Sequence, residues 1–176
     1  MSYAALVEQP KTIAHFPDWQ RGENAALWFD APLEIGGFTE MGLFLHGEAR
    51  SDMPNRNVGF EITYVIPNSK RRFALQRLDW ESWKGSHTNP RKSGWPLRGK
   101  KCLATHIYPF ALNWVEGSKK FRKGDLPVAT NIDGELQTFE QARASAGFFL
   151  GISNIELVKR PPWDYTGGYG GLDPAQ

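Results

Sequence analysis

The clearest pattern in the chain is an alternation of hydrophobic and polar positions from Val58 to Ile66. A period of two is typical of a β-strand that is buried on one face. After a polar link at residues 67–70, alternation returns from Arg71 to Trp80, and places Arg77 and Asp79 on the same face. Pro, Asn and Ser in the link favour a tight turn. The two segments therefore predict a β-hairpin.

Shorter apolar segments, separated by turn residues, have the composition of further strands. One helix is predicted at Phe139–Leu150, where apolar residues recur on one helical face. Thr138 and Gln141 form a capping box before it, and Gly151 follows as a stop. The further strands are predicted at Ala25–Phe29, Leu33–Ile35, Met41–Ala49, Lys101–Phe110 and Ile155–Val158.

The order of these elements indicates the fold class. Strands and helices do not alternate regularly, so a doubly wound parallel sheet is not expected. The sequence predicts an α+β fold, in which a curved, mainly antiparallel sheet of roughly six to eight strands carries one C-terminal helix packed on it. Residues 1–163 are expected to form a single domain. Residues 164–176, rich in Gly and Tyr, are expected to form a flexible tail that docks on a protein partner.

Composition narrows the class of protein. Of the 176 residues, 40% are hydrophobic and 23% are charged, which are the values of a globular domain. The net charge of +2 does not by itself predict a polyanionic partner. Cys102 is the only cysteine, which excludes an intrachain disulfide and favours a cytoplasmic location. The apolar stretch Ala4–Val7 is too short for an export signal or a membrane span, so neither is expected.

Positive charge is concentrated in the long connection between the predicted strands, where no acidic residue lies between Lys84 and Lys101. Cations attract phosphate and aromatic rings stack on unpaired bases, so this segment predicts binding of single-stranded RNA. The alternative is a solvated basic loop whose tryptophans fold back over the core. The residues predicted to bind are Trp83, Asn89, Arg91, Lys92, Trp95, Arg98, Lys100 and Tyr108.

Two histidines flank this segment. A chain that leaves one strand and returns on its neighbour brings His87 and His106 together. Two imidazoles and a cation, Lys101 or Lys100, are the minimum for metal-free RNA cleavage, because one imidazole removes the 2′-hydroxyl proton and the other protonates the leaving oxygen. The alternatives are a hydrogen-bonded core residue for His106 and a turn residue for His87.

Motifs for metals and cofactors are missing from the sequence. It contains no His-x-His, Cys-x-x-Cys or His-Glu-x-x-His, so a metal would have to use His87 and His106 with Asp79 or Cys102. There is also no Walker loop, no Gly-x-Gly-x-x-Gly before a helix and no Gly-x-Ser-x-Gly. We therefore expect neither a metal nor a cofactor.

Three short motifs follow one another along the chain: Arg77-Leu78-Asp79, His87-Thr88-Asn89-Pro90 and His106-Ile107-Tyr108. They resemble a family of small uncharacterised bacterial proteins with Arg-Leu-Asp, His-x-Asn-Pro and His-x-His-x-Tyr motifs, over residues 58–157. The first histidine of that last motif falls on Ala104 here. The resemblance implies a toxin-like or defence-related role and brings no established activity.

Two functions are therefore expected from the sequence. The first is a nucleic-acid-associated protein, either a metal-independent ribonuclease or a toxin-like RNA binder. The second is a non-catalytic β-rich module that binds a protein or carbohydrate partner through its seven tryptophans. Whether the protein is an enzyme stays open at this point.

Overall fold

Four long antiparallel strands form the centre of the structure, a computed structural model that describes residues 2–164. They are β3 (Ala26–Ile35), β4 (Phe38–Arg50), β5 (Val58–Val65) and β6 (Arg72–Trp80), and each pairs with the next. The predicted β-hairpin is confirmed as β5 and β6. The predicted strands at Ala25–Phe29 and Leu33–Ile35 are one strand, β3. The tail predicted at residues 164–176 lies outside the described residues, except for Asp164.

Shorter strands extend the sheet on both sides, in the order β1-β3-β4-β5-β6-β9-β12, with β2 also paired to β3. Two further pairs lie apart from it, β7 with β8 and β10 with β11. The bounds of the short strands are Lys11–Ile13 (β1), Gln20–Arg21 (β2), His87–Thr88 (β7), Lys101–Cys102 (β8), His106–Tyr108 (β9), Trp114–Val115 (β10), Lys120–Phe121 (β11) and Thr130–Asn131 (β12).

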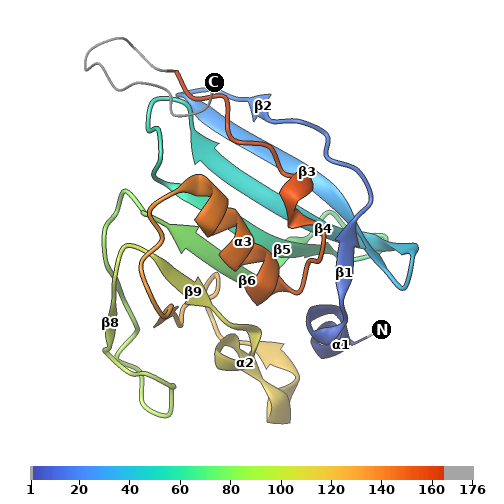
Figure 1. The fold of residues 1–176 in the computed structure, drawn as a ribbon. Helices are drawn as coiled ribbons and strands as arrows, with labels where there is room; N and C mark the ends of the chain where they lie inside the picture. The colour runs from blue at the N-terminus through green and yellow to red at the C-terminus, as the bar shows by residue number, and fades with distance from the viewer. Residues whose placement is uncertain (1, 165–176) are drawn as a thin grey trace.

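The predicted helix at Phe139–Leu150 is confirmed as α3. The Thr138 side chain accepts a hydrogen bond from the Gln141 amide, the Gln141 side chain accepts one from the Thr138 amide, and Gly151 ends the helix in the left-handed conformation. Figure 1 shows α3 lying across one face of the sheet. The other helical segments are α1 (Tyr3–Glu8), α2 (Phe110–Asn113) and the 3-10 helices η1 (Glu116–Ser118) and η2 (Ile155–Leu157). The predicted α+β fold, an antiparallel sheet with a C-terminal helix on it, is therefore confirmed.

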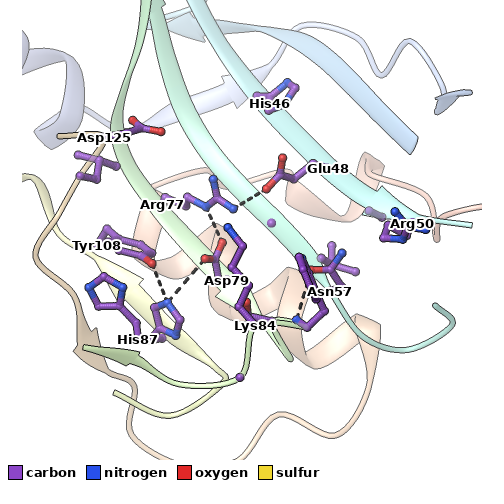
Figure 2. Close-up of a pocket in the computed structure, with 18 of the residues that line it drawn as sticks. His46, Glu48, Arg50, Asn57, Arg77, Asp79, Lys84, His87, Tyr108 and Asp125 are labelled. Carbon is purple, nitrogen blue, oxygen red and sulfur yellow. Dashed lines mark hydrogen bonds and ion pairs between the residues drawn. The ribbon is translucent and has the colours of Figure 1, made fainter. Parts of the chain in front are cut away.

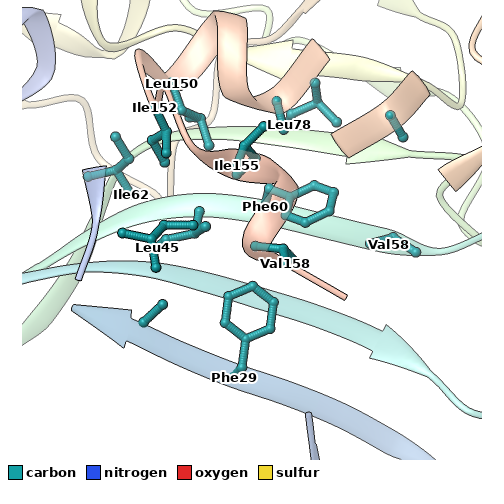
Figure 3. Packing of buried hydrophobic residues seen from close by; sticks show 14 of the residues in the cluster. Phe29, Leu45, Val58, Phe60, Ile62, Leu78, Leu150, Ile152, Ile155 and Val158 are labelled. Atoms are coloured by element: carbon teal, nitrogen blue, oxygen red, sulfur yellow. The ribbon is translucent and has the colours of Figure 1, made fainter. Parts of the chain in front are cut away.

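The hydrophobic core fills the space between α3 and the sheet. In Figure 3 the side chains of Leu150, Ile155 and Val158 lie over Phe60 and Leu78. The Phe29 ring packs directly on the backbone of Gly47 and occupies the place where a Cβ would stand, so that position accepts only glycine. The apolar side chains of the central strands therefore make the α3 face of the sheet.

The opposite face of the same strands is polar. A register shift in β5 and β6 leaves Leu75 without a partner, because Ile62 pairs with Gln76 and Thr63 with Ala74. Beyond this bulge the alternation is regular. Arg77 and Asp79 share one face, as the sequence predicted, and the structure shows that this is the face away from α3.

Two predicted strands are wrong. Lys101–Phe110 is not one strand: it breaks after Cys102, resumes at His106, and Phe110 already begins α2. Ile155–Val158 is not a strand, because Ile155–Leu157 forms η2. Short apolar segments fit several buried conformations, so their pattern does not distinguish a strand from a tight helical turn. None of the helices within residues 2–164 has the length and apolar character required to cross a membrane.

Candidate functional site

A cavity of about 710 Å³ opens on the polar face of the sheet, the side away from α3. Its lining comes from β3, β4, β5, β6 and β9, and its rim includes residues 82–87 and 125–126. Small-molecule sites typically measure about 300–1,000 Å³. We call this cavity the polar pocket; Figure 2 shows the side chains in it.

Arg77 lies at the centre of the polar pocket, between Glu48 on β4 and Asp79 on its own strand (Figure 2). Its guanidinium donates hydrogen bonds to both carboxylates. Burial opposes the charge of Arg77, but Asp79 and Glu48 more than compensate and raise the pKa of the guanidinium above its ordinary value. Arg77 is therefore a fixed cation whose charge is already largely neutralised.

Glu61 on β5 adds a third carboxylate to this cluster, with its Oε2 3.7 Å from Nη1 of Arg77. Burial raises the pKa of Glu61 to about 7, because the attraction of Arg77 does not offset the lost hydration and Glu48 adds repulsion. Glu61 does not itself line the polar pocket. Its protonation near neutral pH changes the charge that surrounds Arg77.

His106 on β9 forms one wall, with only 2% of its surface exposed. Its Nδ1 lies 2.7 Å from the carbonyl oxygen of Leu103, which only accepts hydrogen bonds, so Nδ1 carries a hydrogen. Burial lowers the pKa of His106, although the Leu103 carbonyl and Asp79 favour the charged form. The neutral ring therefore accepts a hydrogen bond at Nε2 from the Tyr108 hydroxyl, 2.9 Å away.

Tyr108 and Asp79 complete the surroundings of His106. Burial raises the pKa of the Tyr108 phenol well above its ordinary value, so the hydroxyl keeps its proton. Asp79 Oδ2 lies 3.6 Å from Nε2 of His106 and attracts an imidazolium when one forms. A proton on Nε2 of His106 therefore lies close to both the Tyr108 hydroxyl oxygen and the Asp79 carboxylate.

His87 on β7 lies beside this pair (Figure 2). The His87 and His106 rings stack with centroids 5.6 Å apart, and the Tyr108 ring lies 5.3 Å from His87. His87 donates from Nε2 to the carbonyl of Pro127 at 3.1 Å, which leaves Nδ1 as the acceptor. The proximity expected from the sequence is thus present, and it arises because β7 pairs with β8, with His87 opposite Cys102.

The remaining predicted binding residues divide into two groups. Trp83 and Tyr108 line the polar pocket together with Lys84, which was not among the residues predicted to bind. Asn89 is buried: its amide exchanges hydrogen bonds with the backbone of Ala129 and donates to the carbonyl of Leu97. Asn89 therefore anchors the loop that follows it.

The basic residues of that loop lie outside the polar pocket. The Trp95 ring packs between Lys92 and Arg122, at 4.5 and 5.4 Å from its centroid. Arg98 donates to the carbonyl of Arg91, while Lys100 and Lys101 are exposed. Two roles therefore stay predictions: RNA binding by Arg91, Lys92, Trp95, Arg98 and Lys100, and supply of a catalytic cation by Lys101.

Sequence reasoning missed a third imidazole in the polar pocket. His46 on β4 donates from Nδ1 to Asp30 at 2.8 Å, and Asp30 also accepts two hydrogen bonds from Arg72. Burial opposes ionisation of Asp30, but Arg72 and His46 together hold its pKa below the ordinary value. The signal was present, because His46 alternates with Leu45 on β4. Its neighbours become visible only once the strand register is known.

Neither a metal-binding cluster nor a similarity to a known protein identifies the site further. No group of three or more His, Cys, Asp or Glu side chains within the described part of the chain is arranged to hold a metal ion. Cys102 is buried, and burial raises the pKa of its thiol. The chain matches no protein-family model, no curated protein and no solved structure.

Proposed function

We propose that the protein is a metal-independent acid–base enzyme that cleaves single-stranded RNA in the polar pocket. The observation that carries the proposal is the approach of the His87 and His106 rings to 5.6 Å, with Tyr108 in contact with both. Acid–base cleavage needs a proton acceptor and a proton donor on opposite sides of the reacting phosphate.

His87 is the proposed base. Its Nδ1 takes the proton of the 2′-hydroxyl while the 2′-oxygen forms a bond to phosphorus and the bond to the 5′-oxygen breaks. The proposed donor is Tyr108, which passes its proton to the leaving oxygen and receives one from Nε2 of His106. His106 is thus a positioning and proton-supplying residue, since its own ring is shielded. Lys84 at the rim supplies charge for the phosphate.

This scheme has a defined pH dependence. The donor requires a protonated His106, and burial lowers the pKa of His106 from the ordinary value of 6.5. The protonated form therefore becomes populated only as the pH falls below that value. We expect kcat/KM to rise from neutral to mildly acidic pH.

The test is cleavage of a fluorogenic single-stranded RNA in excess chelator. We expect a 2′,3′-cyclic phosphate product and no cleavage of the matching DNA, which lacks the attacking hydroxyl. His87→Ala should lose roughly 10²–10⁴-fold in rate. His15→Ala removes an exposed histidine outside the polar pocket and should keep full activity. Absence of cleavage at every pH, or equal rates for wild type and His87→Ala, would overturn the proposal.

A second candidate is non-catalytic binding of a carbohydrate, favoured by the balance of charge in the polar pocket. Arg77 is paired with carboxylates, which weakens its attraction for phosphate. Trp28 and Trp83 also line the pocket, and flat rings pack well on sugar faces. Titration with oligosaccharides, monitored by tryptophan fluorescence, distinguishes carbohydrate binding from RNA cleavage. A carbohydrate site should give saturable binding, and His87→Ala should bind the oligosaccharide as tightly as the wild type.

A further inference from the structure

A second cavity of about 420 Å³ lies along the sheet beyond the polar pocket. Its walls combine aromatic rings, from Phe73, Trp114 and Phe121, with the cations of Arg71 and Lys120. The rings form an edge-to-face cluster, with the Trp114 and Phe121 centroids 5.1 Å apart. This cavity, which we call the aromatic cavity, therefore offers apolar ring surface and positive charge together.

The aromatic cavity adjoins the polar pocket. Asp125 and Leu126 line both, so one short segment separates the two spaces. Asp30 also links them, because it binds His46 of the polar pocket and Arg72 of the aromatic cavity. An extended ligand that fills the polar pocket thus has the aromatic cavity as its next binding surface.

The charges of the aromatic cavity are not all neutralised. Arg72 pairs with Asp30, and Lys119 pairs with Glu116. Arg71 and Lys120 have no acidic partner among residues 2–164, and both are exposed at the rim. Unpaired cations next to flat apolar rings match the two parts of a nucleotide, its phosphate and its base.

We infer that the aromatic cavity is a subsite for the nucleotide that follows the two joined by the cleaved bond of a single-stranded RNA. The base of that nucleotide packs against Trp114 and Phe121, and Arg71 and Lys120 hold its phosphate. This inference rests on the proposed function, because it assigns the neighbouring nucleotide of the same substrate. A longer strand is consequently the preferred substrate, whereas a dinucleotide fills the polar pocket alone.

Replacing Asp125 should strengthen binding of RNA, whereas loss of a cation from the aromatic cavity should weaken it. Its carboxylate stands between the two cavities, where the strand has to cross, and it repels phosphate. Replacing it by a neutral residue of the same shape removes that repulsion. Asp125→Asn should therefore bind a longer strand more tightly than the wild type, while binding of a dinucleotide stays nearly unchanged.

The experiment measures binding to His87→Ala, which leaves the probe intact. The probes are an RNA dinucleotide and a single strand of about ten nucleotides, within the site sizes of single-strand grooves. Arg71→Glu and Lys120→Glu should each weaken binding of the longer strand by roughly tenfold at low salt. The slope of the logarithm of the binding constant against the logarithm of the salt concentration should become shallower by about 0.7 for each phosphate that is no longer neutralised. Lys159→Glu makes the same charge change at an exposed site outside both cavities and should have no effect.

The outcomes separate this inference from the proposed function. Cleavage of the dinucleotide by the wild type tests the function alone, since the dinucleotide fills only the polar pocket. If it is cleaved but the two reversals leave binding of the longer strand unchanged, the subsite is wrong and the function stands. If it is not cleaved but the reversals weaken binding, the subsite stands without the cleavage. An acidic peptide that binds the aromatic cavity as tightly as RNA would overturn the assignment to a nucleotide.

Discussion

The two faces of the central sheet are built from the same strands and differ in almost every other respect. On the α3 side, Phe60 and Leu78 are fully buried among apolar neighbours. On the other side, Arg77 and Asp79 of the same hairpin belong to a chain of carboxylates, imidazoles and hydroxyls around an open cavity. One face holds the fold together, and the other places polar and ionisable side chains around a cavity.

This division follows from strand geometry. Because successive side chains point to opposite faces, a strand that donates its apolar positions to the core has its polar positions free for a site. The core fixes the strands, and the strands in turn fix the polar side chains, whose spacing depends on strand register. Substitutions on the two faces should therefore have different effects on stability and on function.

The largest effect is expected on the α3 face. Phe60 is fully buried and contacts Phe139 of α3, with ring centroids 6.1 Å apart. Phe60→Ala should lower the free energy of unfolding by about 3–5 kcal/mol, because it removes apolar burial and leaves a cavity. Trp83→Ala, at the rim of the polar pocket, is the control, since 62% of Trp83 is exposed. Urea denaturation should show a change of no more than about 0.5 kcal/mol for Trp83→Ala. If both variants lose the same free energy of unfolding, the α3 face contributes no more to stability than the polar pocket does.

A smaller, pH-dependent effect is expected for Glu61 beneath the polar pocket. Burial raises its pKa to about 7 from the ordinary 4.5. As the pH rises between these values, the unfolded chain gives up the Glu61 proton first, so Glu61 lowers the stability of the wild type across this window by roughly 3 kcal/mol relative to Glu61→Gln. Glu61→Gln cannot ionise and should lack this loss.

The measurement for Glu61 is urea denaturation of both proteins at pH 4.5 and pH 8. Glu61→Gln should gain stability relative to the wild type as the pH increases. Glu23→Gln, which changes an exposed carboxylate, serves as the control and should follow the wild type. If the wild type and Glu61→Gln change in stability by the same amount between the two pH values, Arg77 keeps Glu61 ionised and the prediction fails.

Much of the fold was predictable because its signals are local. Alternation identified β5 and β6, and it placed Arg77 and Asp79 on one face without any knowledge of their partners. The capping box and Gly151 gave both ends of α3. Such signals need only neighbouring residues, and therefore they can be read directly from the sequence.

The candidate site was predictable only in part, because its interactions join distant strands. The proximity of His87 and His106 was predictable, because the connection between them was expected to leave one strand and return on its neighbour. The bonds from Arg77 to Glu48 and from His46 to Asp30 depend on the register of β3 to β6, which includes a bulge at Leu75. Asn89 was predicted to bind a ligand, and its three hydrogen bonds to the backbone could not be inferred from its neighbours.

Apart from the Trp83 control, the smallest effect on stability is expected at His87, on the rim of the polar pocket. His87 is half-buried and makes one hydrogen bond, to Pro127, so His87→Ala should change the free energy of unfolding by less than about 1 kcal/mol. Asn89 lies two residues away and is 1% exposed, and Asn89→Ala should cost roughly 2–3 kcal/mol because it leaves buried backbone groups unpaired. Thermal denaturation of the two variants compares them directly. If His87→Ala is as destabilising as Asn89→Ala, His87 belongs to the structural framework, and a loss of activity in that variant reports folding rather than proton transfer.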